Sequence, residues 1–108
     1  MYSDNDLKKL VKLILNKAPD VRRIVLFGSY AKSAQRSDSD LDIAVLVDKK
    51  LERRQKLQLL KELLNVVGDN GFSVDFIIKP FEEYAAEIRL PTLSQVLRTE
   101  GEVLWQKI

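Results

Sequence analysis

The feature that most constrains this chain is the alternation of short apolar runs with longer amphipathic segments. Runs rich in β-branched and aromatic residues lie at residues 21–27, 41–47 and 72–78. Runs of this length and composition are typical of buried strands. Segments with helical periodicity flank and separate them. Helices and strands interleaved in one short chain predict an α+β fold, with a small sheet covered by helices.

Two helices have clear boundary signals. The motif Ser3-x-x-Asp6 is a capping-box-like start. A second, long helix is expected over about residues 49–67, with Asp48 as its cap and Gly68 as the left-handed residue that ends it. The first helix has one apolar stripe, formed by Leu7, Leu10, Val11, Ile14 and Leu15.

Shorter elements complete the predicted order. A helical turn is expected near residue 30, and Pro80 suits the first turn of a short helix that reaches about Ile88. Another helix starts at Pro91 and is closed by Gly101. The last apolar run, 103–105, predicts an edge strand, which makes a small mixed sheet of about four strands.

Composition limits the chemistry. The 108 residues are enough for one core, so we expect a single domain over 1–108. The chain has no cysteine and no histidine, which excludes disulfides, thiolate catalysis and imidazole bases or ligands. Catalysis would have to use carboxylates, hydroxyls, Lys or Arg, backbone amides or a hard metal.

The charge balance is slightly basic, with 18 Lys and Arg against 16 Asp and Glu. No basic stripe is interleaved with aromatics, so direct nucleic-acid binding is not expected. The charge run at Glu52-Arg53-Arg54 is typical of a solvated helix face. No apolar run is long enough to span a membrane, and the polar N-terminus does not resemble a signal peptide. We expect no membrane association and a cytoplasmic location.

Gly28-Ser29 directly follows a predicted strand. Glycine allows a sharp turn and a close approach of the backbone to an anion. If a helical turn begins there, its free amides and the Ser29 hydroxyl would point at that anion. The alternative is an ordinary turn that ends a strand.

Asp40-Leu41-Asp42 stands where the second strand begins. Side chains alternate along a strand, so both carboxylates would project from one face, roughly 6.5 Å apart, while Leu41 and Ile43 face the core. Adjacent like charges repel, and a hard divalent cation removes that conflict. The alternative is a polar strand start with two solvated aspartates.

Asp75 lies inside the third apolar run. A buried, unpaired carboxylate in such a strand would be costly. If the third strand lies beside the second, Asp75 can complete a three-carboxylate cluster, which can hold two metal ions. The alternative is an outward-facing surface residue.

These residues carry a family resemblance. Gly28-Ser29, followed after ten residues by Asp40-Leu41-Asp42 and later by Val74-Asp75-Phe76, resembles the signature of the DNA polymerase β-like nucleotidyltransferases. The chain is most similar to their minimal members, whose element order it shares, so a polymerase β-like palm fold is implied.

The resemblance also implies roles for site residues. Gly28 and Ser29 would bind the nucleotide, while Asp40, Asp42 and Asp75 would be catalytic and would coordinate Mg²⁺ at a two-metal site. Ala31-Lys32-Ser33 stands where many relatives have Ala-Arg-Gly. This departure leaves the carboxylates intact but weakens the expected binding of phosphate. Lys32 can substitute there as a point charge, and the alternative is an ordinary solvated lysine.

The implied activity is transfer of a nucleoside monophosphate, AMP from ATP above all, to a hydroxyl. In the resembled family some members are antitoxins that adenylylate a tyrosine of a HEPN-domain toxin, so a HEPN protein is the implied partner. One alternative is a non-catalytic antitoxin that acts by contact. Another is a small-molecule nucleotidyltransferase of the aminoglycoside type, although such enzymes usually carry an added acceptor domain.

Three aromatic residues are candidates for either an interface or the core. They are Phe81, Tyr84 and Trp105. Exposed aromatics often anchor interfaces, so self-association also stays open.

Overall fold

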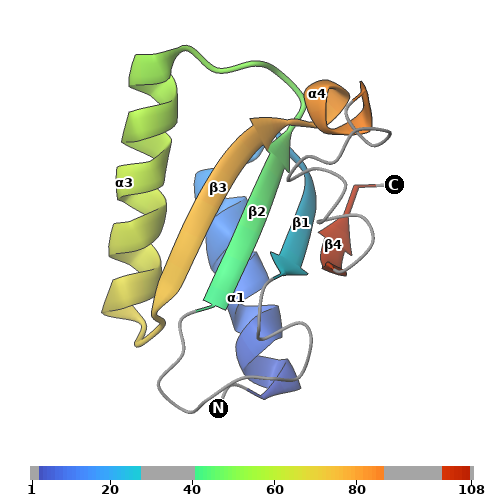
Figure 1. Ribbon diagram of the computed structural model, residues 1–108. Coiled ribbons are helices and arrows are strands. Elements are labelled where there is room, and N and C mark those ends of the chain that lie inside the picture. Colours follow the sequence, from blue (N-terminus) through green and yellow to red (C-terminus); the bar gives the residue numbers. More distant parts are fainter. Residues whose placement is uncertain (1–2, 28–40, 87–100, 108) are drawn as a thin grey trace.

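The structure is a computed structural model that describes residues 3–27, 41–86 and 101–107 (Figure 1). The predicted turn near residue 30 and the helix from Pro91 lie outside these residues. In chain order the elements are α1 (Asp4–Lys17), β1 (Val21–Phe27), β2 (Leu41–Val47), α3 (Arg53–Asp69), β3 (Val74–Pro80), α4 (Phe81–Ala86) and β4 (Glu102–Gln106).

The four strands form one mixed sheet in the order β3-β2-β1-β4. β1 runs antiparallel to both β2 and β4, whereas β2 and β3 are parallel. A parallel pair needs a crossover between its strands, and α3 supplies it. The predicted α+β fold with a mixed four-stranded sheet is confirmed, as is the position of the last strand at an edge.

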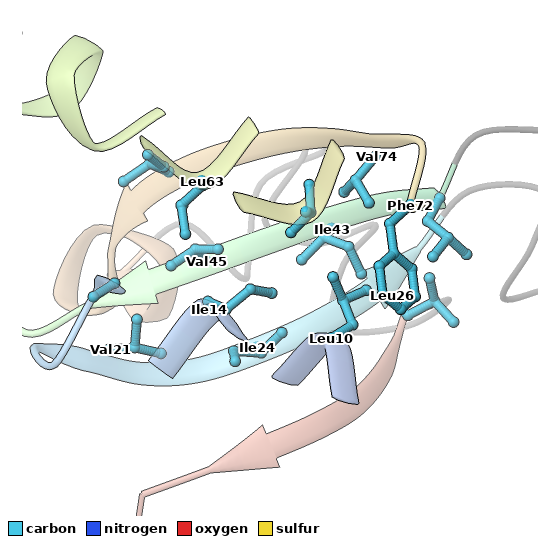
Figure 2. Packing of buried hydrophobic residues seen from close by; sticks show 14 of the residues in the cluster. Leu10, Ile14, Val21, Ile24, Leu26, Ile43, Val45, Leu63, Phe72 and Val74 are labelled. Atoms are coloured by element: carbon cyan, nitrogen blue, oxygen red, sulfur yellow. The ribbon is translucent and has the colours of Figure 1, made fainter. Parts of the chain in front are cut away.

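One face of the sheet packs against α1 and α3 and contains the main core. Leu10 and Ile14 of α1 and Leu63 of α3 are fully buried, and they meet alternate residues of β1 and β2 (Figure 2). The buried strand residues of this face are Val21, Ile24, Leu26, Leu41, Ile43, Val45, Val47, Val74 and Ile78. We call it the helix-bearing face.

The opposite face carries a smaller apolar cluster, covered by α4 alone among the described elements. Its buried members are Val25, Ala44, Leu46 and Tyr84, with Phe27 and Phe81 packed beside them. We call it the α4 face. The strand residues of the two clusters alternate along β1 and β2, as the period of two in a strand requires.

The start of α1 agrees with the sequence prediction. The Ser3 hydroxyl accepts a hydrogen bond from the Asp6 amide at 3.1 Å, and the Ser3 amide donates to the Asp6 carboxylate at 2.9 Å. These reciprocal bonds form a capping box. Hydrogen bonding from Ser3 holds the pKa of Asp6 below its ordinary value of 3.8.

The start of α3 differs from the prediction. The helix begins at Arg53 with Glu52 as its N-cap, four residues beyond the predicted start at about residue 49, so Asp48 does not cap it. The Asp48 amide instead donates to the Asp20 carbonyl at 2.9 Å, and its carboxylate pairs with Lys107 at 3.4 Å. Those contacts hold Asp48 in the connection that leaves β2.

The end of α3 also differs, since Gly68 lies inside the helix and the left-handed residue is Gly71, with a φ of 84°. The Gly71 amide donates to the Gly68 carbonyl at 3.0 Å, and the Phe72 amide donates to the Val67 carbonyl at 2.9 Å. This pair of bonds is a Schellman motif. Phe72 and Val67 share the main core, which completes the motif with an apolar contact.

As a result, the third strand starts two residues later than predicted, at Val74. Pro80 is its last residue, and α4 begins one residue further on, at Phe81. Neither α1, α3 nor α4 combines the length and the apolar character that a bilayer crossing requires.

Candidate active site

Asp42 lies at the second position of β2, between two fully buried residues of the main core, Leu41 and Ile43. Because neighbouring side chains in a strand point to opposite faces, Asp42 belongs to the α4 face. Its side chain is partly buried. The prediction that Leu41 and Ile43 face the core is therefore confirmed.

Asp75 reaches the same place from the adjacent strand. In the parallel pairing of β2 with β3, Asp42 and Asp75 are register partners. Paired residues of neighbouring strands lie about 4.8 Å apart and project to the same side. The sequence-based condition that the third strand lie beside the second is met, and Asp75 is exposed rather than buried.

The remaining predicted site residues, Gly28, Ser29 and Asp40, lie outside the described residues. β1 ends at Phe27, which is the antiparallel register partner of Asp42. Among residues 3–27, 41–86 and 101–107, no three acidic, histidine or cysteine side chains form a metal-binding group. The described part therefore brings together two of the three predicted carboxylates.

The chemistry of this pair suits a hard divalent cation. Carboxylate oxygens are the ligands that Mg²⁺ takes from proteins, one or two at a time, together with phosphate oxygens. Two aspartates in direct register repel each other in the absence of a cation. The position of Asp75 on the exposed edge strand β3 leaves its carboxylate accessible from outside.

Sequence reasoning missed an arginine–aromatic cluster on the same face. The Arg22 guanidinium lies 4.1 Å from the Phe81 ring centre, and that of Arg23 lies 5.0 Å from the same centre and 5.8 Å from that of Tyr84. The Arg23 Nε is buried without a hydrogen-bond partner among the described residues. Two arginines inside an apolar strand are the sequence signal that could have revealed this cluster.

All three aromatic candidates pack against other residues of the chain. Tyr84 is 4% exposed in the α4-face cluster. Phe81 packs beside that cluster, and Trp105 packs against the main core from β4. None of them is a freely exposed anchor.

A mixed sheet with this order and paired aspartates on one face is the arrangement of a nucleotidyltransferase domain. The family described as "Polymerase beta, Nucleotidyltransferase" matches residues 8–107. The chain belongs to this family, which confirms the resemblance drawn from the spacing of Gly28-Ser29, Asp40-Leu41-Asp42 and Asp75.

Individual relatives agree with this assignment. The chain is 31% identical over 97 residues to protein adenylyltransferase MntA of Shewanella oneidensis, covering 90% of this chain and 63% of that protein. It thus spans less than two thirds of the length of MntA.

Solved structures are also similar. A chain from the crystal structure of a toxin–antitoxin with AMP-PNP is 29% identical with a TM-score of 0.65, over 94% of this chain and 74% of that one. A chain from the complex of tri-AMPylated Shewanella oneidensis HEPN toxin with MNT antitoxin is 27% identical with a TM-score of 0.57, over 94% and 70%.

Proposed function

We propose that this protein is an antitoxin that transfers AMP from ATP to a tyrosine hydroxyl of a HEPN-domain toxin. The observation that carries the proposal is the register pairing of Asp42 with Asp75 on the accessible face of β2 and β3. Membership of the nucleotidyltransferase family supports the reaction class. The names of the relatives, an adenylyltransferase and an AMPylated toxin complex, support the acceptor.

In this proposal Asp42 and Asp75, with Asp40, hold Mg²⁺, while Gly28 and Ser29 bind the triphosphate. The bound metal would neutralise charge on the phosphates and lower the pKa of the attacking hydroxyl. Asp42 is partly buried and lies between two core residues of β2, and in this proposal its carboxylate holds the metal on the nucleotide side. The exposed Asp75 accepts a hydrogen bond from the acceptor hydroxyl and orients its oxygen.

The reaction is an in-line displacement. A bond forms between the tyrosine oxygen and the α-phosphorus, the bond from that phosphorus to the bridging oxygen breaks, and pyrophosphate leaves. The hydroxyl proton passes to the Asp75 carboxylate and from there to solvent. Because β3 is an edge strand, an acceptor as large as a folded protein can approach Asp75.

The test is transfer of label from α-labelled ATP to a HEPN-domain protein from the same genome, with Mg²⁺ present. We expect wild type to label the acceptor and Asp75→Asn to lose at least about 100-fold in rate. Asp75→Asn should keep much of the ATP affinity, since an interaction expressed only in the transition state lowers turnover without weakening ground-state binding.

The matched control is Asp20→Asn, which makes the same chemical change at an exposed turn beside the carboxyl end of β2, at the opposite end of that strand from Asp42. Equal labelling by Asp75→Asn and Asp20→Asn would remove Asp75 from the site. Neutralisation of the toxin by wild type without any labelling would favour an antitoxin that acts by contact alone.

A further inference from the structure

The start of α3 carries an unusual concentration of positive charge. Residues 49–56 hold five cations and one carboxylate, a net charge of +4, in a chain whose total is +2. The other 100 residues therefore carry −2. The five side chains are exposed, and none has an ion-pair partner within the described ranges 3–27, 41–86 and 101–107.

This arrangement works against the stability of the helix. The N-terminus of a helix favours acidic side chains, yet the first turn of α3 contains no acidic residue and opens with Arg53 and Arg54. Arg53 and Lys56, three residues apart within the helix, also repel each other. The amide of the N-cap residue Glu52 donates to the Gln55 side chain at 3.1 Å, which supports the helix start but does not pair the arginine charges. Charges that break a local rule in this way are typical of a functional surface.

Apolar surface accompanies this charge. Leu57, one turn after Arg53, is 55% exposed, and Leu64, two turns further, is 42% exposed. On the other side of the helix start lies a cavity of about 410 Å³, with Lys50, Lys56 and Lys79 around apolar walls that include Leu51 and Ile77. Lys79 is paired with Glu83 at 3.9 Å, so the free charge belongs to Lys50 and Lys56.

We propose that the basic face of α3, formed by Arg53, Arg54, Lys56, Leu57 and Lys61 of the helix and by Lys50 just before it, is a docking surface for an acidic, partly apolar surface of the partner protein. The inference rests on the proposed function for the partner's identity as a HEPN-domain protein. Charge complementarity selects an acidic partner, because the cations exceed the nearby carboxylates. Arginine is enriched in protein interfaces, and the exposed Leu57 beside Arg53 adds apolar contact area.

A protein fits this face better than a nucleic acid does. Binding of single strands combines cations with aromatic platforms on which bases stack. The basic face contains no aromatic residue. Its apolar component is leucine, which gains by contact with apolar side chains rather than with phosphates.

The docking surface is separate from the carboxylate pair. Asp42 and Asp75 lie near the amino ends of β2 and β3, whereas α3 starts beyond the carboxyl end of β2 (Figure 1). The six residues from Asp42 to Val47, five steps along the strand, alone span about 16 Å. A partner can therefore hold the basic face while its acceptor hydroxyl reaches the other end of the sheet, so binding and transfer are separable.

The test is calorimetric titration of the full chain with a HEPN-domain protein from the same genome, at about 50 and 300 mM NaCl. Arg53→Glu/Arg54→Glu should weaken binding at least about tenfold and flatten its salt dependence. Acidic residues suit these two positions in the helix, so the thermal midpoint should hold or rise, which separates lost docking from lost folding. Leu57→Gln should weaken binding several-fold without changing its salt dependence.

The matched control is Lys8→Glu/Lys12→Glu on α1, which makes the same change in net charge at two exposed positions. It should leave the affinity unchanged. Unchanged affinity of Arg53→Glu/Arg54→Glu, or an equal loss in the α1 control, overturns the docking surface while leaving adenylyl transfer intact.

Two further results would also overturn it. Failure of wild type to bind the HEPN protein removes this partner, and with it both the docking surface and the proposed acceptor. Binding of a single-stranded oligonucleotide that is lost in Arg53→Glu/Arg54→Glu, with protein binding unaffected, would assign the face to nucleic acid.

Discussion

The two faces of the sheet differ in what they bury and in what they leave open. The helix-bearing face packs against α1 and α3 and contains most of the fully buried side chains. The α4 face has four buried residues at one end and the carboxylates Asp42 and Asp75 toward the other. Alternating residues of one strand thus lie on opposite faces: Ile43 stabilises the fold, and Asp42 belongs to the proposed site.

The largest effect is expected from Ile43→Ala. Ile43 is fully buried on the helix-bearing face, so its truncation should lower the free energy of unfolding by about 4 kcal/mol through lost burial and a residual cavity. Urea denaturation followed by circular dichroism measures this loss. A loss below about 1 kcal/mol would mean that the packing of this face has been overestimated.

A matched pair of valines compares the faces directly. Val45 lies on the helix-bearing face and Val25 on the α4 face, and both are essentially inaccessible to solvent. Val45→Ala should cost about 2–3 kcal/mol, whereas Val25→Ala should cost about 1–2 kcal/mol because its smaller surroundings can collapse more easily. Equal losses in urea denaturation would contradict the asymmetry.

The capping box of α1 predicts a smaller, pH-dependent effect on the helix-bearing face. Since the pKa of Asp6 in the folded state lies below its unfolded value of 3.8, its stabilisation is complete above that value and is lost as the pH falls through the folded pKa. Asp6→Asn should remove this acid-dependent component. The measurement is the thermal midpoint of wild type and of Asp6→Asn between about pH 2 and pH 6, a range that spans about two units on either side of the ordinary aspartate pKa. The two midpoints should converge at the acid end.

The smallest stability change is expected at the carboxylates. Asp75→Asn removes one of two like charges in register, so the free energy of unfolding should stay within about 0.5 kcal/mol of wild type or rise. The same urea titrations measure it. A loss comparable to that of Val25→Ala would show that Asp75 is structural, and would contradict its assignment to the chemistry of this face.

Much of the fold could be predicted from local patterns in the sequence. Ser3 and Asp6 predicted the start of α1, and the apolar runs predicted three strands, because capping and period-two burial are encoded by neighbouring residues. The boundaries of α3 were missed at both ends. Asp48 is held by Asp20 and Lys107, which lie far from it in sequence, and Gly71 rather than Gly68 takes the left-handed turn.

The site was predictable only in part. The spacing of Asp40 and Asp42 predicts a carboxylate pair on one face, of which the described residues include Asp42 alone. The partnership of Asp42 with Asp75 depends on which strands are neighbours and in what register. Those are properties of the sheet that no local pattern contains. The run Glu52-Arg53-Arg54 predicted only a solvated helix face. The exposed Leu57 and the cavity near the helix start follow from the fold.

The parallel register of β2 and β3 limits how proteins of this kind can diverge. A single inserted residue at the start of β3 would turn Asp75 to the opposite side of the sheet, and two would displace it along the strand by about 6.6 Å. Any change in the length of the connection after α3 would therefore separate Asp75 from Asp42 completely. Substitutions in this connection are compatible with the carboxylate pair, whereas insertions and deletions are not. We therefore expect the Schellman turn at Gly71 to keep its length in homologues.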